Sequence, residues 1–221
     1  MTEKLTRWTE QHALLMSMGL AAALLEKSTL LMAAMASGSF LGLIIRFRGQ
    51  YTPDGSLGLA NSVTLLRTLA TLSLLLAGSA LAPEWQASLI AGLVIAGSWL
   101  VRRRRLASPF EVLFQQETGG FLLLTSSLLL FSTGRLGAWI LLPGILHYLP
   151  VLLRQIARPR HTLACHPFTG SINAIATLGF AACLLPGVSN ALLLMLAITS
   201  TLALTGSFLY STTRLLSQRG Q

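Results

Sequence analysis

Apolar residues occur along this chain in long stretches that short polar turns separate. Six stretches after residue 60 are long enough, or nearly long enough, to form membrane-spanning helices: 62–82, 86–101, 110–131, 136–153, 171–187 and 190–210. A helix needs about 20 mostly apolar residues to cross a bilayer. Since the bilayer offers backbone groups no water to bind, such stretches form helices, and the helices pack as a bundle. The pattern predicts an all-α membrane helix bundle with six core transmembrane helices.

Residues 1–57 show a weaker pattern. Two apolar pieces, 12–25 and 29–45, are divided by a short polar segment. The first piece is short for a span and suits the membrane interface, whereas the second is just long enough to cross. We expect residues 1–57 to form an N-terminal amphipathic or transmembrane segment and a loop, and residues 58–221 to form the six-helix membrane domain. The pattern leaves open on which side of the membrane the N-terminus lies.

The composition supports a membrane protein with several spans. Hydrophobic residues make up 53% of the chain and charged residues 10%, whereas a soluble domain carries about 25% charged residues. The net charge of +9 is also found in proteins that bind nucleic acids. Here, however, the basic residues lie at the ends of apolar stretches, where membrane topology places them. We therefore expect no nucleic-acid partner.

Arginines lie at alternate ends of the apolar stretches. Those at one end are Arg46 and Arg48 before the first core stretch, residues 102–105 after the second, Arg154, Arg158 and Arg160 after the fourth, and Arg214 and Arg219 after the sixth. The connections at the other end contain one basic residue, Arg135. By the positive-inside rule, the arginine-rich ends face the cytoplasm. We therefore expect a multi-pass protein whose C-terminus is cytoplasmic.

Short motifs follow one another in a fixed order along the core stretches. Residues 61–67 read NSVTLLR, residues 97–102 read GSWLVR, and residues 108–111 read SPFE. In this order they resemble the N-x-L-T-L-L-R, D-G-x-x-A-R and S-x-F-G segments of the CDP-alcohol phosphatidyltransferases, membrane enzymes that make phospholipids. The resemblance covers residues 58–212 and implies six core helices with both ends in the cytoplasm. It also implies a bacterial inner membrane as the location and phospholipid biosynthesis as the pathway.

The acidic residues of that family's signature are missing from this chain. The signature reads D-x2-D-G-x2-A-R-x8-G-x3-D-x3-D, and with Arg102 as its arginine the four aspartate positions fall on Val94, Gly97, Gln115 and Gly119. The resemblance implies that three of the aspartates hold two Mg²⁺ or Mn²⁺ ions and that the fourth is the base. Hard divalent cations need oxygen ligands, and these four side chains offer one neutral carbonyl. We therefore expect a degenerate member with no catalytic residue, metal or cofactor.

Four arginines near the cytoplasmic side are candidate ligands for a phosphate or a lipid head group. Arg67, Arg102, Arg154 and Arg158 could hold a phosphate through bidentate hydrogen bonds. The alternative is that they only anchor the helices against anionic lipid. Arg102 is the best single candidate for a ligand contact, because it occupies the motif position of the family.

Two glutamates lie in the third core stretch. Glu111 shares a helix face with Gln115 and Gly119, because the three are spaced four residues apart. One carboxylate cannot hold two divalent cations, so we favour an ion pair with the arginines at 102–105, with a ligand contact as the alternative. Glu117 lies about 200° around the helix from Gln115. An acid within an apolar helix faces a partner or a wet cavity, so Glu117 is expected to make a helix–helix contact or to take part in binding.

His161, Cys165 and His166 lie close together in the sequence beside a turn that contains Pro and Gly. A metal site there is the less favoured interpretation, since the spacing matches no common metal motif. Cys165 and Cys183 lie in different segments, and we expect no disulfide between them.

Three functions are compatible with these observations. The first is a catalytically inactive relative of the CDP-alcohol phosphatidyltransferases that acts by binding a membrane lipid or a membrane partner protein, as a homodimer or a heterodimer. The second is an active transferase with a rearranged site, which would require Mg²⁺ or Mn²⁺. The third is a transporter of lipids or small molecules, although the broken helices of many transporter sites are not evident.

Overall fold

The computed structural model describes residues 2–26, 28–52, 54–103, 108–157 and 167–217. Helices account for all regular structure in these residues, so the all-α prediction is confirmed, and each of the six core stretches contains a helix. The α-helices are α1 (Thr2–Glu26), α2 (Leu30–Arg46), α3 (Gly58–Ala77), α4 (Pro83–Arg103), α5 (Pro109–Ser132), α6 (Leu142–Ala157), α7 (Pro167–Leu184) and α8 (Asn190–Ser217). Short 3-10 helices follow α3 (η1, Gly78–Ala80) and precede α6 (η2, Ala138–Leu141).

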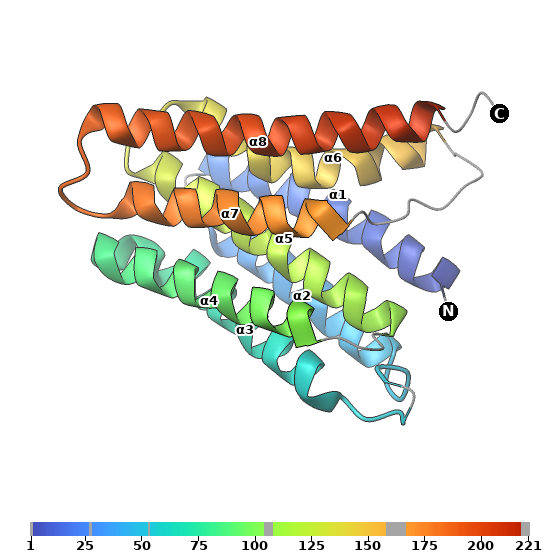
Figure 1. The fold of residues 1–221 in the computed structure, drawn as a ribbon. Helices are drawn as coiled ribbons and strands as arrows, with labels where there is room; N and C mark the ends of the chain where they lie inside the picture. Colours follow the sequence, from blue (N-terminus) through green and yellow to red (C-terminus); the bar gives the residue numbers. More distant parts are fainter. Residues whose placement is uncertain (1, 27, 53, 104–107, 158–166, 218–221) are drawn as a thin grey trace.

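Successive α-helices run in opposite directions, so that the turns between them alternate between the two ends of the bundle (Figure 1). The start of α1 and the end of α8 lie at the same end. At the other end, Arg135 Nη2 donates hydrogen bonds to the Val188 carbonyl at 3.0 Å and to Asn190 Oδ1 at 3.1 Å. These bonds join the turn after α5 to the turn between α7 and α8.

Helix α5 is the centre of the bundle and packs against α3, α4, α6 and α7. Every residue from Gly120 to Leu130 is buried. A helix that is apolar around its whole circumference is one that neighbouring helices surround. Ser108 fixes where α5 begins, because its Oγ accepts a hydrogen bond from the Glu111 N–H at 3.1 Å, and Pro109 occupies the first turn.

Helix α1 begins well before the apolar piece at 12–25 that the sequence indicated. Its early turns are amphipathic: Leu5, Trp8 and His12 are buried, whereas Glu3 and Arg7 form an exposed ion pair at 2.7 Å. Leu5, Trp8 and His12 share one face because they are spaced three and four residues apart. This face packs α1 against α2, α5 and α6.

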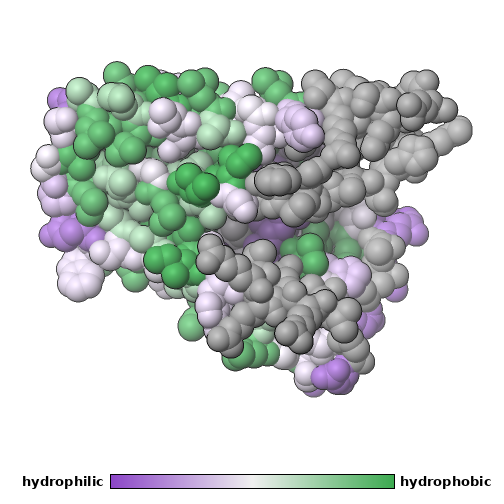
Figure 2. Space-filling model, viewed as in Figure 1, coloured by the Kyte–Doolittle hydropathy of each residue, from purple (hydrophilic) through white to green (hydrophobic). Residues whose placement is uncertain are grey.

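Large apolar side chains cover much of the outside of the bundle. Figure 2 shows many apolar atoms on the face formed by α7 and α8. Exposed examples on these helices are Ile175, Met195 and Leu202. Among the described residues two helical segments are long and apolar enough to cross a membrane, Gly58–Ala77 and Asn190–Tyr210. Soluble monomers rarely expose a contiguous apolar surface of this kind, and these observations support a membrane protein.

Candidate functional site

Two of the four predicted site positions lie in direct contact where α4 meets α5. Gln115 Nε2 on α5 donates a hydrogen bond to the carbonyl of Gly97 on α4 at 3.2 Å. Val94 is buried on α4. Gly119 is partly exposed, and no atom would lie within 4 Å of a Cβ added to it. The structure therefore pairs Gly97 with Gln115.

Arg67 fills the space beside this pair. Its side chain extends from α3 to α4, where Nε donates a hydrogen bond to the Leu93 carbonyl at 2.9 Å. A Cβ added to Gly97 would lie 2.5 Å from both Cζ and Nη2 of Arg67. The residue is 6% exposed, and its buried Nη1 has no hydrogen-bond partner. A side chain at position 97 would therefore have to displace the guanidinium group, which occupies that volume.

The other predicted ligands lie at the edge of what the structure describes. The side chains of Arg102 and Arg154 are outside the described residues, as are Arg158, His161, Cys165 and His166. Glu111 is buried at the start of α5, and its predicted arginine partners at 102–105 are not described either. Cys183 is buried and is not part of a disulfide. In the part of the chain that is described, no group of three or more His, Cys, Asp or Glu residues could hold a metal ion.

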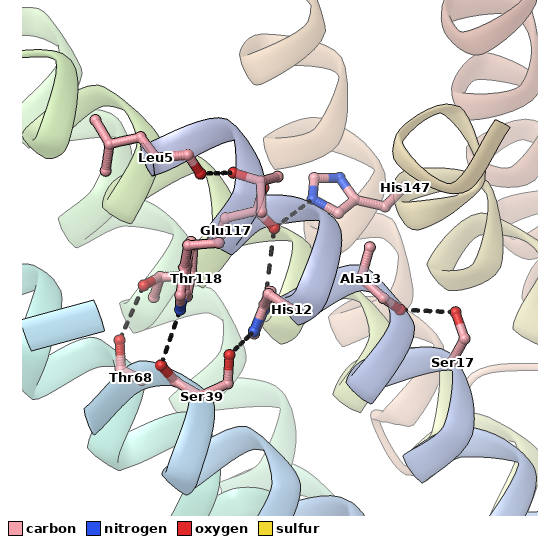
Figure 3. A network of polar contacts seen from close by, with 11 residues as sticks. Leu5, His12, Ala13, Ser17, Ser39, Thr68, Glu117, Thr118 and His147 are labelled. Atoms are coloured by element: carbon pink, nitrogen blue, oxygen red, sulfur yellow. Dashed lines mark hydrogen bonds and ion pairs between the residues drawn. The ribbon is translucent and has the colours of Figure 1, made fainter. Parts of the chain in front are cut away.

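A second polar cluster lies inside the bundle and was only partly foreseen. The carboxylate of Glu117 on α5 is 3% exposed, and its Oε2 lies 3.7 Å from Nε2 of His147 on α6 and 4.0 Å from Nε2 of His12 on α1. Figure 3 shows both imidazoles directed at the same carboxylate oxygen. The predicted helix–helix contact of Glu117 is thus confirmed. His12 and His147 had not been singled out for it.

His12 is held on its other side by α2. Its Nδ1 lies 2.8 Å from Ser39 Oγ, and the neighbouring Trp8 donates from Nε1 to the Ser39 carbonyl at 3.0 Å. The Trp8 and His12 rings are stacked, with their centroids 4.8 Å apart. The His12 side chain is fully buried, and its Nε2 has no hydrogen-bond partner. Ser39 and Trp8 therefore fix the orientation of the imidazole and point Nε2 toward Glu117.

The sequence around Glu117 is adapted to this contact. A Cβ added to Gly120, one turn further along α5, would overlap the imidazole of His147. Thr118 shares a hydrogen bond of 2.9 Å with Thr68 and so joins α5 to α3. The fully buried Tyr148 packs edge-on against His147, with ring centroids 4.9 Å apart. Gly120 is thus small because a ring from α6 crosses α5 at that point.

In comparisons with known proteins, no family model, no curated protein and no solved structure matches the chain.

Proposed function

We propose that this chain is a catalytically inactive, CDP-alcohol phosphatidyltransferase-like membrane protein that acts by binding a membrane lipid or a membrane partner protein. The observation that carries the proposal is the position of the Arg67 guanidinium group beside Gly97. At a position where the resemblance implies an aspartate that binds divalent cations, the chain has a glycine with an arginine against it. A buried positive charge repels Mg²⁺ or Mn²⁺, and Glu84, the one acidic residue of α4, lies in the first turn of that helix, far along it from Gly97.

The same site is suited to binding an anion. Nη1 of Arg67 is a buried donor without a partner, and burying such a group costs free energy unless a ligand or another group satisfies it. Arginine forms bidentate hydrogen bonds with phosphate oxygens. A phosphate group of a membrane lipid is therefore the ligand that we expect at this site, with Arg102 as a second contact. The protein would work as a homodimer or as a heterodimer with another membrane protein.

We expect no Mn²⁺-dependent binding of a CDP-alcohol when the purified protein is titrated with it by isothermal calorimetry with and without Mn²⁺. The reason is that Val94, Gly97, Gln115 and Gly119 provide no carboxylate for a metal–diphosphate complex. Binding that depends on Mn²⁺ and is lost in Glu111→Gln would overturn the proposal in favour of an active transferase with a rearranged site.

The proposed location is a bacterial inner membrane, crossed by all six core helices. Exposed apolar residues on α7 and α8 support this (Figure 2). A second support is that α2, which ends at Arg46, and α4, which ends at Arg103, both end on the same side of the bundle (Figure 1). The start of α1 lies at that same end. This arrangement favours a cytoplasmic N-terminus, with both α1 and α2 crossing the membrane or neither doing so.

Topology reporters fused to the full-length chain test this orientation. We expect a reporter that is active only in the cytoplasm to be active at both termini, because the positive-inside rule places the arginine-rich end there. A reporter inserted at Arg135, in the turn after α5, should give the opposite result. Activity of a periplasmic reporter at the C-terminus would contradict the proposed topology.

A further inference from the structure

The cluster of His12, Glu117 and His147 joins three helices that are distant in the sequence. Its members come from α1, α5 and α6, and all three side chains are less than 10% exposed. We propose that these residues form a buried proton-binding site, which holds one proton and thereby fixes α1 to the bundle. The proposal is independent of the function proposed above, since the cluster contains none of the residues around Arg67.

The balance of charge requires a proton. An ionised carboxylate in an apolar interior is strongly destabilising unless a positive charge neutralises it. Among the side chains that the structure describes, the titratable ones in contact with the cluster are its own members and Tyr148. Helix α2 supplies neutral Ser39 and Phe40, and α3 supplies neutral Thr68 through Thr118. No lysine or arginine of the described residues forms an ion pair with Glu117. The neutral state of the cluster is therefore the state with one added proton.

The three side chains are not placed to hold a metal ion. Ligands bound to Zn²⁺ at 2.0–2.2 Å lie about 3.4 Å apart in a tetrahedral site. The two nitrogen–oxygen distances here are 3.7 and 4.0 Å, and no described group of residues has a geometry that could hold a metal. Both distances also exceed a direct hydrogen bond, so each contact is electrostatic and a small movement of either side chain would close it.

The proton belongs mainly to the pair of His147 and Glu117. His147 is the closer imidazole and is 9% exposed, whereas His12 is fully buried, so charging His12 would cost more. The hydroxyl of Ser39 is able to donate to Nδ1 of His12. His12 then carries its own hydrogen on Nε2, which points toward the carboxylate.

Loss of this proton weakens the packing of α1 against the rest of the bundle. Without it, a buried negative charge would be left beside two neutral imidazoles. Hydration of that charge requires water to reach Glu117, and α1 is one of the helices that cover it. Raising the pH should therefore increase the opening of α1 from the bundle, and lowering the pH should suppress it.

The test uses full-length protein in nanodiscs of phosphatidylethanolamine and phosphatidylglycerol. Infrared spectra and ¹⁵N-histidine NMR at neutral pH should show either a protonated Glu117 carboxyl group or one buried imidazolium, and Glu117→Gln should remove that signal. Hydrogen exchange should show that protection of residues 5–20 falls about tenfold with rising pH in the wild type and does not change with pH in Glu117→Gln. Glu26→Gln, at the exposed end of α1, should behave as the wild type.

Two results would overturn the proposal. One is an ionised Glu117 with both imidazoles neutral while α1 stays fully protected. The other is stoichiometric binding of Zn²⁺ that is lost in both His12→Asn and His147→Asn, because the cluster would then be a metal site. If Glu117→Gln does not fold, His147→Asn serves instead: it should leave the proton on the carboxyl group, where infrared spectra detect it.

Discussion

Replacing Gly120 with alanine is expected to lower the free energy of unfolding by about 2 kcal/mol, as overpacking of a tight core does. The new methyl group would overlap the imidazole of His147, which crosses α5 at this point. That ring is 9% exposed and lies against Tyr148, so it has little room to move away. The expected loss is large because the displaced ring also contacts Glu117.

The neighbouring residue provides the matched control. Gly119 is on the same helix, and no atom lies within 4 Å of the position of its missing Cβ. Alanine is favoured over glycine in a helix by up to about 1 kcal/mol, so Gly119→Ala should be neutral or slightly stabilising. Denaturant or thermal unfolding in one detergent compares the two variants. Equal stability of Gly119→Ala and Gly120→Ala would show that His147 does not occupy the space beside α5.

A second variant separates the overlap from a general intolerance of alanine. In a His147→Ala background the ring is absent, so Gly120→Ala should then cost little. A full cost in this background would assign the effect to α5 itself. Residues in contact show coupling free energies of about 0.5–3 kcal/mol in such cycles, which is large enough to measure.

The helices could be predicted from the sequence because the apolar stretches are long and the turns between them are short. The start of α1 could not, since Glu3 and Arg7 dilute the apolar pattern there. Those charges lie on the exposed face of the helix, while Leu5 and Trp8 on the other face are buried. A search for uniform apolar stretches misses a helix of which only one face is buried.

The site around Arg67 was predictable in part. The resemblance to the family signature related positions Gly97 and Gln115, and the structure joins them by a hydrogen bond. What the resemblance could not reveal is that the Arg67 side chain from α3 would lie against Gly97, because that depends on how the helices pack. The cluster at Glu117 was harder to predict from the sequence. An acid in an apolar helix indicates that it has a partner, but His12 and His147 are distant from it in the sequence.

Replacing Arg67 with alanine is expected to cost about 3 kcal/mol, the size of effect seen when a large buried side chain is truncated. Its side chain fills the space between α3 and α4, and its Nε bonds to the Leu93 carbonyl. Gly97→Ala is expected to cost about 2 kcal/mol, because its methyl group would overlap the guanidinium. Two control variants should be nearly neutral: Arg48→Ala at an exposed arginine, and Gly92→Ala on α4, which has no atom within 4 Å of its missing Cβ.

The double variant decides whether Arg67 truly occupies the site beside Gly97. With the arginine gone, a methyl group at position 97 fills part of the cavity instead of overlapping it, so Arg67→Ala combined with Gly97→Ala should be no less stable than Arg67→Ala alone. The two single effects would then fail to add by about 2 kcal/mol, within the range for residues in contact. If the two single effects on the free energy of unfolding simply add, the guanidinium group does not lie beside Gly97. Position 97 would then be free to accept a carboxylate, and the main support for an inactive site would be lost. Non-additivity would show that the Arg67 guanidinium group occupies the volume beside Gly97.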